Sequence, residues 1–186
     1  VQYLCLAWIM GIFGALCGMA IPFIHLLRFE NVGLFHPFML LALVVTSYLQ
    51  SIYPLSIPMP GYLQWGRMWR YASPAILLII LYMVSLLLGS RPVIVRSYDE
   101  LAGCWLRVDM LFRLAGFALS IYYVVNILRL PRYLARNASI PRYLKGYVTA
   151  IGMSMVFYLV VAAVFNVTLL VVYFYLFCLL NMYLFY

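Results

Sequence analysis

Two residues of opposite charge stand inside an otherwise apolar stretch of this chain. Asp109 and Arg113 are four residues apart in the run 101–130, so in a helix they share one face. Gly116 and Ser120 follow on the same stripe, three and seven residues beyond Arg113. An ionised arginine in an apolar membrane span costs at least about 2.5 kcal/mol by insertion scales, so it usually faces protein or a water-filled path and marks function. The alternative is that Asp109 and Arg113 only neutralise each other, or that the Arg113 side chain reaches the membrane surface.

A second stripe of small and polar residues lies in the apolar run 146–186. Its members fall close to one face at helical spacing, and they are Gly152, Ala162, Ala163, Asn166 and Tyr173. Such a strip allows another helix to approach closely, or it lines a narrow hydrated path. Asn166 is a candidate hydrogen-bond partner for water or for Arg113, and a structural bond between helices is an equal alternative.

The composition places these stripes in a membrane. The chain has 186 residues, of which 68% are apolar and 9% are charged, and its mean hydropathy is +1.07. Too little polar surface remains to cover a water-soluble globule, so lipid is the expected solvent. Unpaired backbone groups are costly in hydrocarbon, and the apolar runs are continuous rather than alternating. The prediction is therefore an all-α integral membrane protein and not a barrel.

Five apolar segments form the predicted single membrane domain, 1–186. We expect helices at about 4–27, 34–53, 73–89, 101–130 and 146–186, with an interfacial loop at 54–70. As one helix, the uncharged and proline-free last segment would be roughly 60 Å long, twice the ~30 Å hydrocarbon core of a bilayer. We therefore expect the last two helices to be long and strongly tilted. A hairpin broken at Asn166 is the competing geometry, which the lack of glycine and proline at 166–168 disfavours.

The net charge of +8 lies mostly in the connections between these segments. The sequence Pro-Arg-Tyr-Leu occurs at 131–134 and again at 141–144. A basic, aromatic connection beside a membrane predicts contact with an anionic lipid such as cardiolipin. The predicted lipid-binding residues are Arg132, Arg136, Arg142 and Lys145. Ordinary anchoring at the interface is the alternative, and nothing in the pattern indicates nucleic-acid binding.

No residue pattern predicts a cofactor or a metal site. His25 and His36 lie near the ends of the first two segments, where bonds to water, headgroups or backbone are expected and haem ligation is a minor alternative. The cysteines lie in apolar segments without metal-ligand spacing, so we expect reduced packing residues at Cys5, Cys17, Cys104 and Cys178.

The long final pair of segments resembles subunit a, the membrane stator of rotary F-type ATP synthases. In that family the first of two long tilted helices carries an essential arginine in an R-L-x-G-like sequence, and this chain has Phe112-Arg113-Leu114-Ala115-Gly116. The final helix of the family has a polar residue, aliphatics, an aromatic stretch and a further aliphatic run, to which 165–183 is similar. The chain departs from the family at Tyr173, where a glutamine is usual, and in carrying Asp109 one turn before the arginine.

The resemblance implies a proton-translocating stator. Arg113 would face the ring of c subunits and separate two aqueous half-channels, so that proton flow turns the ring. The channel-lining residues would be Asn166, Tyr173, Ser120, Asp109 and Glu100. The partners would be the c-ring and other subunits of a large complex in the mitochondrial inner membrane, with no bound cofactor. Consistent with import, the chain begins at Val1 without a basic n-region, so we expect a mature span left after removal of a presequence.

Two other classes of function stay open. A non-catalytic accessory subunit of a respiratory-chain or other organellar membrane complex would be indifferent to the charge of Arg113. An independent channel or transporter would more often show an internal repeat, and none is evident beyond the Pro-Arg-Tyr-Leu pair.

Overall fold

All the regular elements that the structure describes are helices. The computed structural model describes residues 33–56, 64–137 and 142–164, together with 169–170, 172–173, 175–177 and 179–180. Its helices are α2 (Pro37–Ser56), α3 (Trp65–Leu87), α4 (Tyr98–Cys104), α5 (Val108–Asn137) and α6 (Arg142–Val164). The predicted first helix, 4–27, lies outside the described residues.

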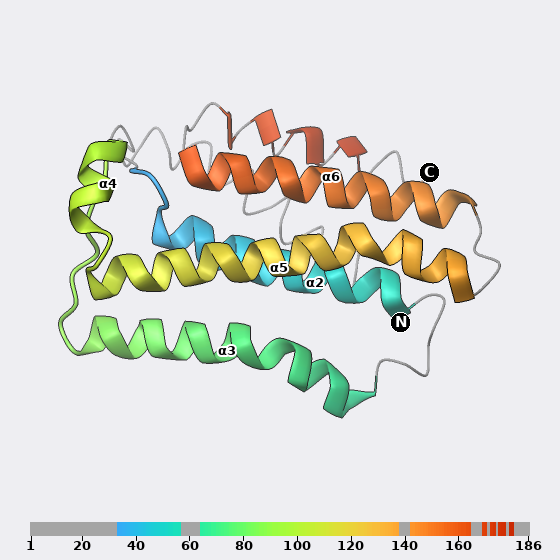
Figure 1. Ribbon diagram of the computed structural model, residues 1–186, viewed down its shortest axis with the longest axis horizontal. Coiled ribbons are helices and arrows are strands. Elements are labelled where there is room, and N and C mark those ends of the chain that lie inside the picture. The colour runs from blue at the N-terminus through green and yellow to red at the C-terminus, as the bar shows by residue number, and fades with distance from the viewer. Residues whose placement is uncertain are drawn as a thin grey trace.

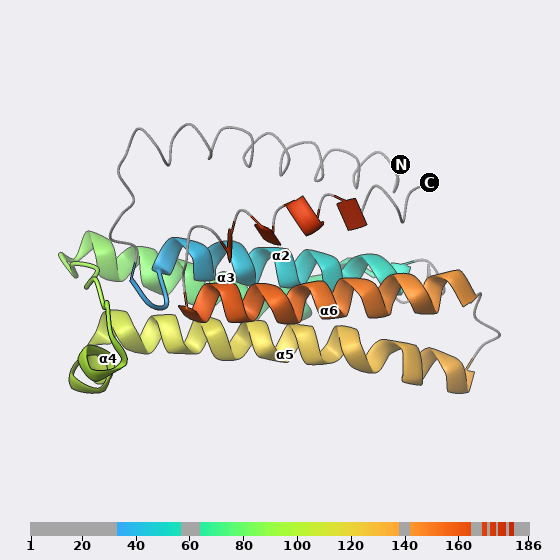
Figure 2. The same cartoon turned by 90° about the horizontal axis from the view of Figure 1, so that it is seen from above.

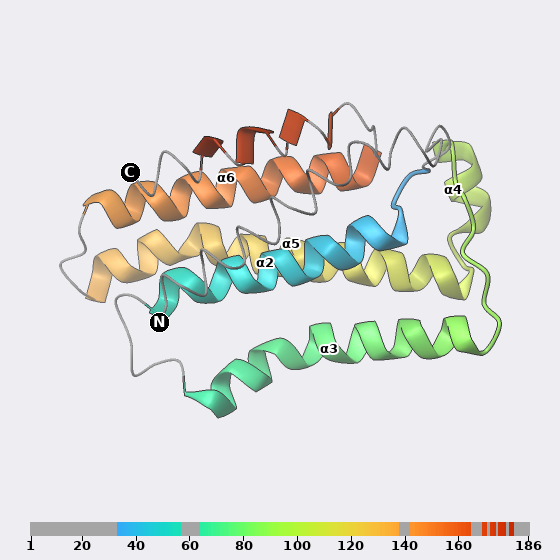
Figure 3. The same cartoon turned by 180° about the vertical axis from the view of Figure 1, so that it is seen from behind.

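The long helices lie side by side, and successive ones run in opposite directions (Figure 1). Helix α5 packs against α2, α3 and α6. The view from above shows α5 along one side of the bundle next to α6 (Figure 2), and the view from behind shows it between α6 and α3 (Figure 3). The short α4 lies at the end of the bundle where α3 ends and α5 begins. This alternation brings the start of α3, the end of α5 and the start of α6 to the opposite end.

The apolar helices are long enough to cross a membrane. Three described helices meet this condition by length and composition, over Trp65–Leu87, Val108–Arg132 and Lys145–Val164. A shorter apolar helix covers Met39–Ile52. The prediction of an all-helical protein with membrane-crossing helices is confirmed at this level, and the chain is compatible with a multi-pass membrane protein. The predicted tilt of the last two helices stays a prediction.

The boundaries of two predicted helices are wrong. The segment 101–130 was expected as one helix, but α4 ends at Cys104 and α5 begins at Val108. The helix expected at 73–89 begins at Trp65, so part of the predicted interfacial loop is helical. Pro74 stands inside α3 and cannot donate to the Arg70 carbonyl, but the Ser73 hydroxyl donates to that carbonyl at 2.8 Å. This replacement bond lets the helix continue through the proline, with a bend that Figure 3 shows.

The expectation of a single helix over 146–186 is also wrong. Helix α6 ends at Val164, and the described residues between 169 and 180 run back along it (Figures 1 and 3). The Tyr173 ring stacks on the Tyr158 ring with 4.7 Å between centroids, whereas fifteen residues of one helix would separate them by about 22 Å. The apolar run therefore folds back on itself, as in the disfavoured hairpin, and its described parts bury side chains against each other. Asn166, where that hairpin was expected to turn, lies outside the described residues. Tyr173 and Phe177 join Ile151, Met155 and Tyr158 in the core.

Candidate functional site

Asp109 and Arg113 form a buried ion pair at the start of α5. The Nη2 of Arg113 lies 2.5 Å from the Oδ2 of Asp109, in the i, i+4 spacing that the sequence indicates. Only 3% of Asp109 and 4% of Arg113 is exposed. Asp109 also lies in the first turn of α5, where the helix dipole favours a negative charge.

Groups from α3 and from the α3–α4 connection complete this site. The Tyr82 hydroxyl donates to the Oδ1 of Asp109 at 3.2 Å, and the Val93 N–H donates to its Oδ2 at 3.1 Å. Arg113 donates from Nη2 to the Val93 carbonyl at 2.7 Å. We call Asp109, Arg113, Tyr82 and the Val93 backbone the polar clamp. It ties the end of α3, the connection and the start of α5 to one another, and the Asp109 carboxylate accepts three hydrogen bonds within it.

A second link fixes the same end of the bundle. The Leu34 N–H donates to the Val95 carbonyl at 2.7 Å. A Cβ added to Gly33 would lie 2.1 Å from that carbonyl oxygen, so the close approach requires glycine. Leu34, Val95 and Met110 form a small buried cluster there. The segment before α2 therefore packs directly on the connection that carries Val93.

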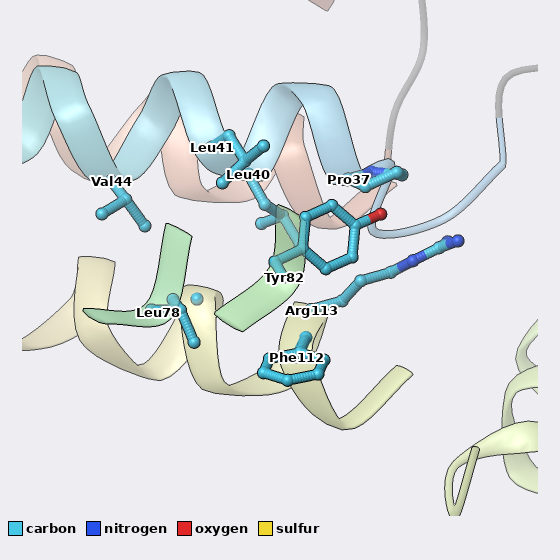
Figure 4. Close-up of a pocket in the computed structure, with 9 residues that line it drawn as sticks. Pro37, Leu40, Leu41, Val44, Leu78, Tyr82, Phe112 and Arg113 are labelled. Carbon is cyan, nitrogen blue, oxygen red and sulfur yellow. The ribbon is translucent and has the colours of Figure 1, made fainter. Parts of the chain in front are cut away.

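A small, largely apolar cavity lies beside Arg113. It has a volume of about 20 Å³ and is lined by residues of α2, α3 and α5. In Figure 4 the aliphatic stem of Arg113 lies beside this cavity, and the guanidinium points away from Leu40, Leu41 and Val44. The Nε of Arg113 is buried without a hydrogen-bond partner. Since one water needs roughly 10–15 Å³, the cavity has room for about one water.

The positive charge of Arg113 also affects His36, which lies in the segment before α2. Burial lowers the pKa of His36, and the nearby Arg113 charge lowers it further. Both effects favour the neutral imidazole when the protein is folded. Haem ligation by His36 stays an untested alternative. Within the described residues, no group of three or more His, Cys, Asp or Glu side chains could hold a metal ion.

The residues predicted to line a channel with Arg113 occupy separate places. The Ser120 hydroxyl is buried and donates to the Gly116 carbonyl of its own helix at 2.9 Å. Glu100 caps α4, since its Oε2 accepts from the Arg96 N–H at 2.8 Å and its own N–H donates to Ser97 Oγ. Tyr173 is stacked in the core on α6. Asn166 lies outside the described residues. Of the described members of this predicted set, Asp109 is the one that contacts Arg113.

The other end of the bundle carries a cluster of exposed cations that we call the basic end. Arg67 and Arg70 begin α3, Arg129 and Arg132 stand in the last turns of α5, and Lys145 stands in the first turn of α6. The sequence singled out Arg132 and Lys145 as lipid-binding residues. The side chains of the other two, Arg136 and Arg142, lie outside the described residues.

Sequence reasoning missed Arg67 and Arg70, which it placed in a loop. The signal that would have found them is the alternation of helices, because the start of α3 must lie beside the end of α5 in an up-and-down bundle. Every described acidic residue, namely Asp99, Glu100 and Asp109, lies at the polar-clamp end.

Comparison of the chain with protein-family models, with curated proteins and with solved structures finds no match.

Proposed function

We propose that this chain is a non-catalytic helical subunit of a larger membrane assembly, in which the polar clamp holds the helix ends together. The observation that carries this proposal is that the Asp109 carboxylate is paired and hydrogen-bonded within the chain. The carboxylate accepts hydrogen bonds from Arg113, Tyr82 and Val93, and Arg113 donates a second hydrogen bond to the Val93 carbonyl. A charge pair that is hydrogen-bonded in this way across three segments is better suited to fixing the relative positions of those segments than to transferring protons.

The outer surface of α3 supports membership in an assembly. Only 17% of its most apolar stretch is buried inside this chain. Large apolar side chains are exposed along it, at Leu77, Ile80, Leu81, Met83, Val84 and Leu87. Lipid or helices of other subunits must cover such a surface. The mitochondrial inner membrane belongs to this proposal as the location, on the basis of the sequence resemblance.

The stator function is a second proposal, and one observation favours it. Arg113 is a buried arginine on a membrane-crossing helix, and its Nε has no hydrogen-bond partner. A carboxylate of a rotor ring that approached Arg113 would have its pKa lowered and would release its proton. Two observations weigh against this proposal. The Asp109 carboxylate already neutralises Arg113, and α6 does not continue as the second long helix of the stator fold.

Removing both charges together separates these proposals. In Asp109→Asn/Arg113→Met, the amide oxygen can accept from the Val93 N–H, its NH2 group can donate to the Tyr82 hydroxyl, and methionine fills the space of the arginine stem. We expect this variant to enter the native complex on blue-native electrophoresis and to leave proton transport by the membranes unchanged. The single variant Arg113→Met leaves Asp109 buried without its cation, and we expect it to fail in assembly. Arg91→Met, at an exposed position near the same end, is the matched control.

The outcome that contradicts the structural role is a double variant that assembles normally and pumps no protons. That result would favour the stator proposal, because the charge itself would then be needed after the fold has been preserved. ATP-driven pumping in membrane vesicles is the measurement.

A further inference from the structure

An apolar groove opens between α2 and α3 near the basic end. It has a volume of about 240 Å³. Val45 and Tyr48 of α2 form one wall, and the other wall includes Trp65, Trp69, Ala72 and Ile79 of α3. The polar group on the α2 wall is the Tyr48 hydroxyl. It donates to the Met68 carbonyl of α3 at 3.3 Å, so it is already hydrogen-bonded to backbone. The groove therefore offers hydrocarbon contact along its length.

The bend at Pro74 accounts for the groove. Figure 3 shows the first half of α3 diverging from α2, whereas the second half runs close to the rest of the bundle. Two small residues, Ala72 and Ala75, line the groove on either side of the proline and leave room between the helices. A kinked helix flanked by small residues thus produces a slot that the two helices do not fill themselves.

The groove is long enough to span one lipid leaflet. From Trp65 to Ile79 the helix rises about 21 Å, compared with about 15 Å for half of the hydrocarbon core. Trp65 and Trp69 stand at its outer end, where 72% and 50% of their surfaces are exposed, and their rings meet edge to face at 5.6 Å. Exposed tryptophans at a helix end mark the membrane interface. The groove therefore runs from the interface into the hydrocarbon, the direction that an acyl chain takes.

The charges at the mouth of the groove select the headgroup. Arg67 and Arg70 lie in the same two turns of α3 as the two tryptophans, so their guanidinium groups are at the depth of a lipid phosphate. Arg129, Arg132 and Lys145 add positive charge at this end, and the described acidic residues all lie at the other end. An anionic headgroup is the complement of this surface.

We propose that one anionic phospholipid binds at the basic end, with an acyl chain in the groove between α2 and α3 and its phosphate at the level of Arg67 and Arg70. The basic end then faces the leaflet that is rich in anionic lipid, as the positive-inside rule also requires. This site is independent of the function proposed above, because it uses no part of the polar clamp.

The test measures thermal unfolding of the purified full chain in a neutral detergent while phosphatidylglycerol or phosphatidylcholine with the same acyl chains is added. At a phosphatidylglycerol concentration about 100 times its Kd, Tm is expected to rise by about 5 to 10 °C. Phosphatidylcholine is expected to give a much smaller rise at the same concentration.

Two sets of variants separate the headgroup from the acyl chain. Arg67→Gln/Arg70→Gln is expected to weaken phosphatidylglycerol binding roughly 30-fold, since each basic residue near an anionic surface contributes about 1 kcal/mol. Its control is Arg91→Gln/Arg96→Gln, two exposed arginines at the polar-clamp end, which should leave the affinity unchanged. Val45→Trp fills the groove from the α2 wall and is expected to abolish most of the Tm rise, and Ile76→Trp does the same from α3. Leu81→Trp, on the exposed face of α3, is the control for added bulk.

Four results would overturn the proposal. One is an equal response to both phospholipids, and another is a full phosphatidylglycerol response in both groove-filling variants that fold. The third is a Tm rise with inorganic phosphate alone that equals the rise with lipid, which would leave an ion site without an acyl chain. If the groove-filling variants keep the lipid response but no longer enter the native complex, a helix of a partner subunit occupies the groove and the proposal is again wrong.

Discussion

The two ends of the helical bundle treat charge in opposite ways. At the polar-clamp end, carboxylates accompany the arginines, and the pair that is buried, Asp109 and Arg113, is held by hydrogen bonds from α3 and from the α3–α4 connection. At the basic end, five cations are exposed at helix ends with no described acidic residue near them. A buried charge must be paired within the chain because its desolvation is costly. An exposed charge is solvated by water and can also contact a group outside the chain.

This difference divides the molecule by role. The polar-clamp end fixes the geometry of the fold, because its groups are satisfied by one another. The basic end leaves its charges to solvent, lipid or another protein. Substitutions at the two ends should therefore differ in kind: those at the polar clamp change the stability of the fold, and those at the basic end change what the protein binds.

The largest expected effect comes from breaking the buried pair. Asp109→Ala leaves the Arg113 charge buried, and we expect a loss of about 3–5 kcal/mol in the free energy of unfolding. Arg67→Ala at the basic end should change this free energy by less than about 0.5 kcal/mol, as exposed substitutions usually do. Unfolding in detergent by a denaturant series measures both. Equal losses at the two sites would remove the distinction between the ends.

A smaller loss is expected where the polar-clamp end is packed most closely. Gly33→Ala places a Cβ against the Val95 carbonyl, so the Leu34 to Val95 hydrogen bond must lengthen or break. A buried backbone group that loses its partner costs about 1–3 kcal/mol. The control is Gly66→Ala at the start of α3, where an added Cβ meets nothing within 4 Å. A destabilisation by Gly66→Ala as large as that by Gly33→Ala would contradict the close packing inferred at Gly33.

The pH dependence of stability should also separate the ends. Because the pKa of folded His36 lies below 6.5, the unfolded chain binds more protons than the folded chain between the two pKa values. Stability is therefore expected to fall as the pH drops below about 6.5, by at most about 1.4 kcal/mol per pH unit, and to level off below the folded pKa. His36→Gln should remove this component, whereas Arg67→Gln should leave it. A stability curve that is the same with and without His36 would show that the burial of this imidazole has no energetic consequence.

The smallest effect on stability is expected from the cations at the ends of α5 and α6. Arg132→Gln/Lys145→Gln should change the free energy of unfolding by less than about 0.5 kcal/mol. The same variant should weaken binding to anionic vesicles by about 1 kcal/mol per residue removed, and this loss should shrink at high salt. Flotation with vesicles of defined composition measures the binding. Unchanged flotation would restrict lipid contact at this end to Arg67, Arg70 and the groove.

Sequence reasoning succeeded where one physical property dominates. The continuous apolar runs predicted membrane-crossing helices, and α3, α5 and α6 contain stretches that are long and apolar enough to cross a membrane. The spacing of Asp109 and Arg113 predicted a shared helix face, and the two side chains form an ion pair. Neither inference depends on a distant part of the chain, because hydropathy and the helical period are local.

Reasoning from the sequence failed where the structure depends on contacts between segments that are far apart in the chain. The run 146–186 has no glycine or proline near its middle, so local rules favoured one helix, but stacking of Tyr173 on Tyr158 stabilises a hairpin. Tyr82 and Val93 carry no sequence signal that connects them to Asp109, since they are 27 and 16 residues away from it. Glu100 was predicted for a channel by its charge alone, and it caps a short helix instead.

The sequence by itself determined the medium, the helical class and the positions of the charges. Composition sets the solvent that a chain needs, and the period of its apolar residues sets the type of element, without reference to contacts. Only the tertiary structure decided which charges are neutralised and which stay available. That depends on which groups the folded chain brings within hydrogen-bonding distance. Arg113 meets a carboxylate and a carbonyl, whereas the exposed cations of the basic end lie where the structure describes no acidic residue.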